Sequence, residues 1–362
     1  SLEGYQIINP GDIIIRPTDL QNDWTSLRVG LAKNRGIITS AYLGLKHDEK
    51  VSSEYLYYLL HSYDLLKVYY GMGTGLRQNL SWDDFKYLPL TLPPKPEQDR
   101  IVAFLDRKTA EIDSLIAKKQ RQIELLDEQK AILINRAVTR GLNPNAKLKP
   151  SGIEWIGEIP EHWITAPMYS RCDVRLGKML DAAKIKGKHL QPYLRNTDVQ
   201  WFEINSLDLP LMDFRPEEYE RYSVQRGDLV VCEGGEPGRA ALWDSDEPCF
   251  FQKALHRVRP LKGDDPRFLL YLFRNAVTMS AFSGVDKATI AHLTGEQLKR
   301  FRFAFPPVTE QAGIAAYLTE AQMRFSETTQ RIESHIDSLN TLRSTLIAHA
   351  VTGRIQVTSS NA

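Results

Sequence analysis

Cysteine is scarce in this chain, and the scarcity bears on both architecture and location. The 362 residues include three cysteines, Cys172, Cys232 and Cys249, which form an odd and widely spaced set. Such a set predicts neither a disulfide framework nor a zinc site, and it favours a reducing compartment. No apolar run approaches the roughly 18 residues that a membrane-spanning helix needs, and no signal peptide opens the chain. We therefore expect a cytoplasmic protein without a membrane partner.

An excess of charge of either sign is also missing. The chain has 46 Lys and Arg against 45 Asp and Glu, a formal net charge of +1. Total charge therefore does not indicate a nucleic-acid-binding protein, although local clusters of Lys and Arg could still do so. The length allows two or three domains with cores of their own.

Motifs for catalysis are missing as well. No glycine-rich loop ends in Gly-Lys-Ser/Thr, and Gly71-x-Gly73-x-Gly75 follows a predicted helix instead of joining a strand to a helix. No Asn/Asp-Pro-Pro-Tyr/Phe tetrapeptide, which an adenine methyltransferase needs to hold a flipped base, is present. The eight histidines show no His-Glu-x-x-His spacing. We therefore predict a chain without a catalytic residue, a metal site or a cofactor of its own.

Isolated polar residues could still suggest chemistry. Asp12 and Asp228 each follow a glycine at the start of a predicted strand, but a nuclease would need a further acid and a lysine at metal-binding spacing. We interpret both as turn residues. His162, between Glu161 and Trp163, is interpreted as a packed surface histidine and not as a base.

An internal repeat is the strongest positive signal. Residues 93–105, PPKPEQDRIVAFL, return as residues 306–318, PPVTEQAGIAAYL. At the same offset of 213, residues 137–139 return as 350–352, and 55–59 match 268–272. The repeat spans whole elements, so it predicts two related halves with two related sites that face a two-fold or bipartite partner.

The repeat also divides the chain. We predict an α+β protein with two mixed α/β globular domains, each followed by a long helix. The domains in order are 1–92, the first globular domain; 93–141, a long helix; 142–152, a linker; 153–305, the second globular domain; 306–353, a second long helix; and 354–362, a tail. Within the domains, short apolar runs at 12–15 and 228–231 predict strands, and Tyr and Leu spacing predicts a helix over 52–70.

Both long helices carry heptad spacing, which is typical of a coiled coil. The predicted pairing residues are Leu105, Ile112, Ile116, Ile123, Leu126, Leu133, Leu318, Phe325, Ile332, Leu339 and Leu346. Lys119 and Lys130 interrupt the first helix and weaken its seam. Because the two seams occupy equivalent places in the repeats, we expect them to pair antiparallel and pseudo-two-fold. The alternative is that each helix packs on its own domain.

Polar and basic loops in both domains favour DNA. Arg, Lys, Asn and Gln read base edges and hold phosphates, and glycines let a backbone approach a large ligand. The candidates in the second domain are Lys178, Lys184, Lys186, Arg195, Asn196, Arg239, Gln252, Lys253, Lys287 and Thr289. Those in the first are Arg16, Asn22, Arg28, Thr74, Arg77 and Gln78. Similar frames with different polar loops are the pattern expected of two domains that read different sequences.

These segments together resemble the specificity subunit of a type I restriction-modification system, over essentially the whole chain. The segment PPKPEQDRIVAFLDRKTAEIDSLIAKKQRQIELLDEQKAILINRAVTRGL resembles the central conserved region of that family, and PPVTEQAGIAAYL with its heptads resembles the distal one. The segments SGIEWIGEIPEHW, LGKML, YLRNTDVQW, CEGGEPGRAALW and DKATIAHLTGEQL are also similar to family members.

The resemblance implies a non-catalytic subunit that reads double-stranded DNA. Each recognition domain would read one half of a bipartite target, and the paired helices would set the spacer and dock two modification subunits. S-adenosylmethionine would bind those subunits, which methylate adenine at N6, and ATP and Mg would bind the restriction subunits. The alternative is an assembly scaffold or decoy subunit without DNA specificity of its own. The missing motifs disfavour a nuclease or methylase in its own right.

One stretch departs from the repeat. Gly11-Asp12 aligns with Gly227-Asp228 at an offset of 216, and the stretch from Gly152 to about Glu217 has no counterpart upstream. We therefore expect the first recognition domain to lack an N-terminal segment. The alternative is a natural truncation completed by a second copy.

Overall fold

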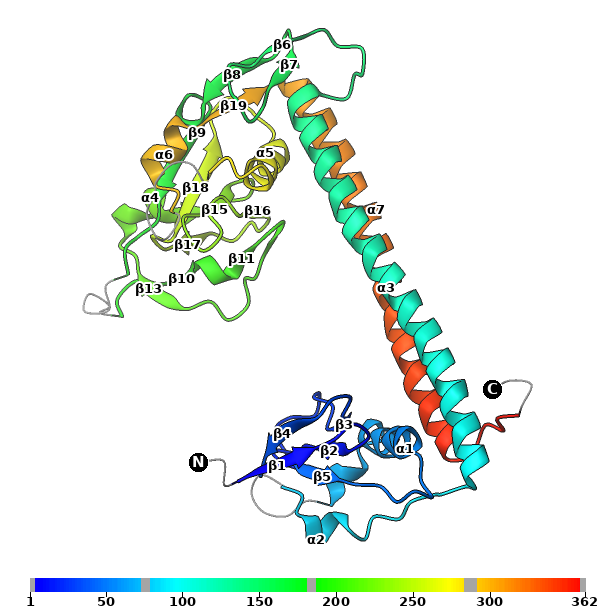
Figure 1. The fold of residues 1–362 in the computed structure, drawn as a ribbon. Coiled ribbons are helices and arrows are strands. Elements are labelled where there is room, and N and C mark those ends of the chain that lie inside the picture. Colours follow the sequence, from blue (N-terminus) through cyan, green and yellow to red (C-terminus); the bar gives the residue numbers. More distant parts are fainter. Residues whose placement is uncertain (1–3, 73–78, 181–186, 283–291, 359–362) are drawn as a thin grey trace. The chain divides into compact units, whose positions relative to one another are not determined.

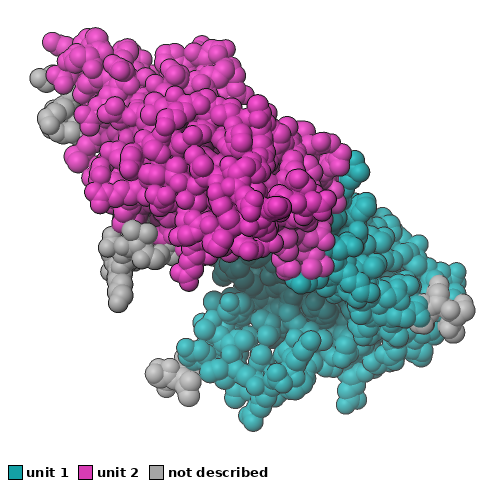
Figure 2. Space-filling view, turned by 90° about the horizontal axis from the view of Figure 1, so that it is seen from above, with its two compact units in different colours: residues 1–123, 329–362 teal, residues 124–328 magenta. Residues whose placement is uncertain are grey.

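The computed structural model describes residues 4–72, 79–180, 187–282 and 292–358 (Figure 1). The chain divides into two compact units, coloured in Figure 2. Unit 1 combines residues 1–123 with 329–362, and unit 2 is residues 124–328. Each unit therefore contains part of both long helices.

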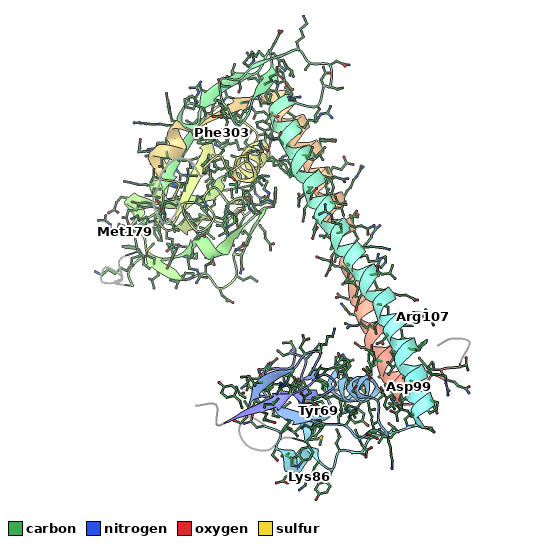
Figure 3. The ribbon with its side chains drawn as sticks, viewed as in Figure 1. Tyr69, Lys86, Asp99, Arg107, Met179 and Phe303 are labelled. Atoms are coloured by element: carbon green, nitrogen blue, oxygen red, sulfur yellow. The ribbon has the colours of Figure 1, made fainter. Side chains whose placement is uncertain are left out.

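The described part of unit 1 contains two small antiparallel sheets and four helical segments, together with the C-terminal part of the second long helix, α7 (Val308–Val351). In the first sheet β1 (Tyr5–Ile8) pairs with β4 (Gly36–Thr39). In the second, β2 (Ile13–Ile15) lies between β3 (Val29–Leu31) and β5 (Leu43–Leu45). The helical segments are α1 (Ser53–Leu65), the 3-10 turn η1 (Val68–Gly71), α2 (Trp82–Phe85) and the start of α3 (Lys95–Arg140). Buried Ile13, Ile15, Leu56, Leu60 and Tyr69, from β2, α1 and η1, belong to one core, and Tyr69 is labelled in Figure 3.

Helix α1 is shorter than the sequence predicts. Ser52 caps its N-terminus, where the side-chain oxygen accepts a hydrogen bond from Tyr55 N–H. The prediction of one helix over 52–70 was wrong at the C-terminal end, because Lys67 adopts the left-handed conformation with φ 59°. The chain then turns through η1, which directs Tyr69 and Tyr70 into the domain.

Unit 2 contains two four-stranded sheets. One has the order β16 (Ala240–Leu242), β15 (Leu229–Cys232), β18 (Leu255–Pro260), β9 (Cys172–Leu176), all antiparallel. The other has the order β13 (Leu211–Asp213), β10 (Leu190–Leu194), β17 (Cys249–Phe251), β14 (Ser223–Val224), with β10 and β17 parallel.

Smaller strand pairs and helices complete unit 2. The pairs are β6 (Leu148–Pro150) with β7 (Glu158–Pro160), β8 (Ile164–Pro167) with β19 (Arg302–Phe305), and β11 (Val199–Gln200) with β12 (Glu203–Ile204). The helices are α4 (Tyr219–Tyr222), α5 (Pro266–Thr278), α6 (Gly295–Arg300) and α7 (Val308–Val351), with 3-10 turns η2 (Met168–Ser170), η4 (Asn196–Asp198) and η5 (Pro216–Glu218). Phe268, Phe273 and Phe303, all fully buried, belong to one core (Figure 3).

The repeat is visible strand by strand. In unit 1, β2 pairs with β3 so that Ile15 lies opposite Val29, and in unit 2, β15 pairs with β16 so that Val231 lies opposite Ala240. The pairs β1–β4 and β14–β17 are equivalent in the same way, since both are antiparallel and adjoin these central strands in the chain. The two units therefore share one frame of five strands and a helix.

A buried glutamine anchors this frame to each long helix. Gln98 Oε1 accepts a hydrogen bond of 2.8 Å from the N–H of Ser52, the residue that caps α1. Gln311 Oε1 accepts the equivalent bond of 3.0 Å from Asp265 N–H, the residue that caps α5. Because these bonds recur at an offset of 213, the most faithful part of the sequence repeat is the attachment of each domain to its helix.

A tyrosine on each domain helix makes a second equivalent contact. Tyr58 OH donates to Asp106 Oδ1 at 2.7 Å, and Tyr271 OH donates to Thr319 Oγ1 at 3.4 Å. In unit 2 the acceptor is the hydroxyl of Thr319, whereas in unit 1 it is the carboxylate of Asp106. The shared geometry thus tolerates a change in the acceptor.

The long helices run antiparallel, in agreement with the fold class expected from the sequence. In unit 1, Leu105 shares a buried cluster with Ile347 and Val351, whereas Lys119 Nζ lies 3.2 Å from His335 Nδ1. The α7 residues that face α3 therefore have falling numbers as the numbers of the α3 residues that they face rise. In unit 2, Ile134, Ala137 and Val138 share a core with Ile314, Ala315 and Leu318. The residues predicted from the heptads are all buried or half-buried within these helices.

Candidate nucleic-acid interface

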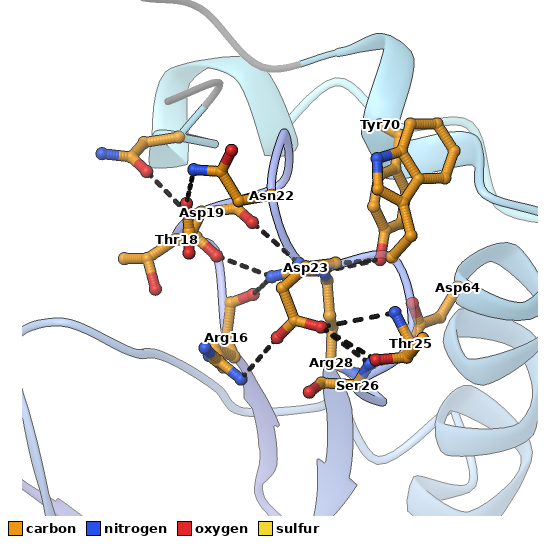
Figure 4. Close-up of polar contacts among 12 residues, drawn as sticks. Arg16, Thr18, Asp19, Asn22, Asp23, Thr25, Ser26, Arg28, Asp64 and Tyr70 are labelled. Carbon is orange, nitrogen blue, oxygen red and sulfur yellow. Dashed lines mark hydrogen bonds and ion pairs between the residues drawn. The ribbon is translucent and has the colours of Figure 1, made fainter. Parts of the chain in front are cut away.

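The loop between β2 and β3, residues 16–28, is held by a network of side-chain hydrogen bonds (Figure 4). Arg28 lies beneath it, 2% exposed. Its Nη1 donates to Thr18 O at 2.6 Å, its Nη2 donates to Asp23 O at 2.5 Å, and its Nε donates to Tyr70 OH at 3.0 Å. One buried guanidinium thus gathers carbonyls from both arms of the loop.

Asp23 holds the tip of the same loop. Its Oδ1 accepts a hydrogen bond of 2.9 Å from Ser26 N–H, and its Oδ2 lies 3.1 Å from Arg16 Nη1 (Figure 4). The bond from Ser26, with help from Thr25 and Arg16, lowers the pKa of Asp23 to about 2. The carboxylate is therefore charged at neutral pH and fixes a tight turn.

An aromatic stack supports the outer side of the loop. The Trp24 ring, 54% exposed, stacks on Tyr70 with ring centroids 4.5 Å apart. Lys67 Nζ donates to Trp24 O at 2.6 Å and lies over the Tyr70 ring at 4.7 Å. The loop consequently presents an exposed surface on a fixed backbone. The exposed residues are Gln21, Asn22, Trp24, Thr25 and Leu27.

The equivalent loop of unit 2, residues 233–239 between β15 and β16, is shorter and is held differently. Arg239 Nη2 donates to Asn196 O at 3.1 Å and to Asn196 Oδ1 at 2.8 Å. Asn196 Nδ2 in turn donates to Gly234 O at 2.7 Å. Arg195 makes paired hydrogen bonds to Asp198, which raise the pKa of the arginine. The arginine, asparagine and glycine loop singled out in the sequence are thus brought together.

A second group in unit 2 surrounds the crossing of Lys178 and Gln252. Their backbones form an isolated parallel bridge, and the carbonyl of Gln252 leaves no room for a Cβ at Gly177. Lys178 Nζ donates to Glu218 Oε2 and to Asp213 O, each at 2.7 Å. The Lys178 ammonium is therefore committed within the protein, whereas the neighbouring Lys253 side chain is exposed.

The sequence candidates thus fall into three groups. Arg16, Asn22 and Arg28 lie in or under one loop of unit 1; Arg195, Asn196 and Arg239 form one cluster of unit 2, and Lys178, Gln252 and Lys253 another. Asn22 is exposed and donates to Asp19 Oδ1 at 2.8 Å. Thr74, Arg77, Gln78, Lys184, Lys186, Lys287 and Thr289 lie outside the described residues.

Sequence reasoning missed the residues that support these loops. In unit 1 they are Asp23, Trp24, Lys67 and Tyr70. In unit 2, Trp201 Nε1 donates to Glu236 Oε1 at 2.9 Å, and Arg274 lies over the Trp201 ring at 4.8 Å. The repeat aligns Arg28 with Arg239, but it gives no signal for these supporting residues, because the two loops differ in length and sequence.

The family model described as "Type I restriction modification DNA specificity domain" matches residues 38–125 and 172–337, well over half of the chain. The chain belongs to this family. Membership in the type I DNA specificity family supports a role for this chain in DNA target recognition.

Relatives in this DNA specificity family are distant. The specificity subunit of type I restriction enzyme MjaVIII from Methanocaldococcus jannaschii is 24% identical over 324 residues, which cover 85% of this chain and 73% of that one. The EcoKI specificity subunit from Escherichia coli strain K12 is 22% identical over 287 residues, and the match covers 76% of this chain and 60% of the relative.

Solved structures show the same fold. A chain from work on complex assembly and conformational transition of the type I R-M system superposes with a TM-score of 0.75 at 17% identity, covering 97% of this chain and 84% of the other. The HsdS subunit from Thermoanaerobacter tengcongensis gives a TM-score of 0.55 at 17% identity, covering 96% and 82%. In the described part of this chain, no helix is long and apolar enough to cross a membrane.

Proposed function

We propose that this chain is the DNA-recognition subunit of a type I restriction-modification complex and that each unit reads one half of a bipartite target. The observation that carries the proposal is the contrast between a shared frame and different loops. The same glutamine bond anchors both domains to their helices. The loops after the equivalent strands β2 and β15 differ in length and in polar side chains.

Within this proposal the paired helices set the distance between half-sites and dock two modification subunits. Large apolar side chains on the outer surface of α3 support docking, since Leu115 is 47% exposed, Leu125 42% and Ile132 68%. Ile132 also lines a cavity of about 410 Å³ in unit 2 together with Arg136 and Arg140. An exposed apolar side chain beside two arginines fits a protein partner that offers apolar and acidic side chains.

The reactions themselves belong, in this proposal, to the partner subunits. Modification subunits would bind S-adenosylmethionine and methylate adenine, and restriction subunits would use ATP and Mg. This chain is proposed as a non-catalytic subunit that selects where those reactions occur.

Binding by the complex with modification subunits tests the proposal directly. The methylated sites in a host that carries this chain and its modification subunits define a target sequence. The complex should bind a duplex with that sequence at least about 10³-fold more tightly than a scrambled duplex at moderate salt. Equal binding of both duplexes would contradict DNA specificity and favour a scaffold or decoy subunit.

A charge-reversal pair tests the surface of unit 2. Lys253→Glu should weaken binding about tenfold and reduce its salt dependence, because Lys253 is exposed beside the Lys178–Gln252 crossing. The matched control is Lys262→Glu, an exposed lysine of the same unit on the connection before α5. Equal losses of DNA affinity in both variants would show that Lys253 has no special role in the interface and that the effect is one of general charge.

A further inference from the structure

Two arginines occupy the same position in the two units. The N–H of Arg16 donates to Arg28 O at 2.8 Å, and the N–H of Cys232 donates to Arg239 O at 2.7 Å. These bonds close the equivalent hairpins one residue beyond the pairs Ile15–Val29 and Val231–Ala240. Arg28 and Arg239 are therefore each the last residue before the return strand, at the base of the loop that differs most between the units.

Arg28 has no donor left for a ligand. A guanidinium has five N–H groups, and the structure gives Arg28 five acceptors. They are Tyr70 OH, Arg16 O, Thr18 O, Asp19 O and Asp23 O. Four of them are carbonyls of its own loop, and the side chain is nearly fully buried. Although the sequence suggests Arg28 as a DNA contact, its geometry is that of an internal clamp.

Arg239 clamps its loop by a different route. Its two bonds to Asn196 reach the turn η4, and Asn196 returns a bond to Gly234 O within the loop. Its Nη1 lies 3.8 Å from Glu236 Oε2. The Arg239 side chain is 17% exposed. The shorter loop of unit 2 is thus tied to a neighbouring element, whereas the longer loop of unit 1 is tied mainly to itself.

We propose that Arg28 and Arg239 are equivalent positioning residues, each of which holds the DNA-reading loop of its own unit in one conformation without reading a base. The physical reason is that a loop ordered before binding loses less conformational entropy when it meets its ligand. The loop tip of unit 1, with exposed Gln21, Asn22 and Trp24, would be the reading surface. This inference rests on the proposed function.

Half-site-resolved methylation tests the assignment. The complex with modification subunits is prepared with Arg28→Lys or Arg239→Lys, and methylation rates are measured on duplexes with single substitutions in either half-site. Lysine keeps the charge but cannot reach several carbonyls at once. We expect each variant to relax discrimination at least tenfold in one half-site and to leave the other within twofold, with the two variants affecting opposite halves.

Two further variants separate positioning from folding. Tyr70→Phe removes the hydroxyl that accepts from Arg28 and donates to Asp23 O at 3.0 Å, and it should relax the same half-site as Arg28→Lys by a smaller factor. Arg171→Lys is the matched control, because Arg171 makes paired bonds to Asp264 far along the chain from either loop. It should lower the melting temperature without changing either half-site.

The outcomes are distinguishable from failure of the proposed function. A wild-type complex that methylates no bipartite sequence would reject the function itself. A normal wild-type motif that Arg28→Lys and Tyr70→Phe leave unchanged would overturn the positioning role. Equal relaxation of both half-sites by each arginine variant would also overturn it, since that pattern indicates general destabilisation.

Discussion

The two units share a frame, yet the same face of that frame is covered in one unit and exposed in the other. In unit 2, Phe250 on β17 is 1% exposed and stacks on Phe214 with ring centroids 4.3 Å apart. In unit 1 the equivalent residue is Ile37 on β4, which is 56% exposed. The equivalence follows from the registers, because Phe250 lies opposite Ser223 and Ile37 lies opposite Ile7.

The covering of unit 2 comes from the stretch that has no partner in the repeat. Strand β10 lies beside β17, with β13 on its other side, and β9 lies beside β18; all three strands lie between residues 172 and 213. In the described part of unit 1, β4 pairs only with β1, and β5 pairs only with β2. Both units therefore attach to their long helices in the same way, whether or not additional strands cover the outer strands of the frame.

The largest expected effect is a loss of stability when the covered face of unit 2 is disrupted. Phe250→Ala should lower the free energy of unfolding of unit 2 by about 3–5 kcal/mol, because it removes a fully buried ring from a packed aromatic cluster. Ile37→Ala, its matched control in unit 1, should change stability by less than about 0.5 kcal/mol. Urea unfolding of the full chain measures both, and similar losses would show that the Ile37 face is buried in solution.

The next effect tests whether the two anchors are equal. Gln311→Ala should lower the free energy of unfolding by about 1–3 kcal/mol, since it leaves the half-buried N–H of Asp265 without this acceptor, and Gln98→Ala should cost a similar amount at the buried N–H of Ser52. Gln330→Ala, an exposed glutamine on α7, is the control. If only one of the two glutamine substitutions lowers stability, the two hydrogen bonds contribute unequally to stability although their geometry is similar.

Acid should weaken both units through one histidine each. Burial lowers the pKa of His61 in unit 1 and of His256 in unit 2, so both stay neutral in the folded chain after they would protonate in the unfolded one. Stability should therefore fall as the pH drops below about 6.5, by at most about 1.4 kcal/mol per pH unit for each histidine. Replacing His256 by Gln should flatten the decline for unit 2 in unfolding measured between pH 7.5 and 5.

The smallest expected effect is a gain in stability from a substitution that makes the apolar seam of α3 more like that of α7. Lys119 on α3 occupies the place that Ile332 holds on α7, and its ammonium contacts only the exposed His335 among the contacts described for it. Lys119→Ile should raise stability by about 1 kcal/mol through added apolar burial. Lys118→Ile, on the exposed side of the same helix, should give no gain in melting temperature.

Much of the frame was accessible from the sequence because periodic apolar residues report burial directly. The heptads predicted both long helices, which begin at Lys95 and Val308, and the β-branched run at 13–15 predicted the central strand of unit 1. The end of α1 was not predictable from Tyr and Leu spacing, since the left-handed turn at Lys67 depends on contacts with Trp24 and Tyr70 from the tertiary fold.

The candidate site was accessible only as a set of loops. Residue type does not say whether a cation faces water or the protein, because that depends on partners distant in sequence. Lys178 is neutralised by Glu218, and Arg28 is enclosed by its own loop. Which of the sequence candidates contacts DNA stays a prediction, and Asn22 and Lys253 have the exposure that such contacts need.

The uncovered face of unit 1 has a consequence for the behaviour of the chain in solution. Ile7 and Ile37 lie opposite each other on a two-stranded sheet, both more than half exposed. An apolar strand pair with an accessible edge is a template on which a strand of another molecule can form hydrogen bonds. Unit 1 is therefore the half of the molecule at which we expect concentration-dependent self-association to begin, and a lysine at position 37 is the simplest change that should suppress it.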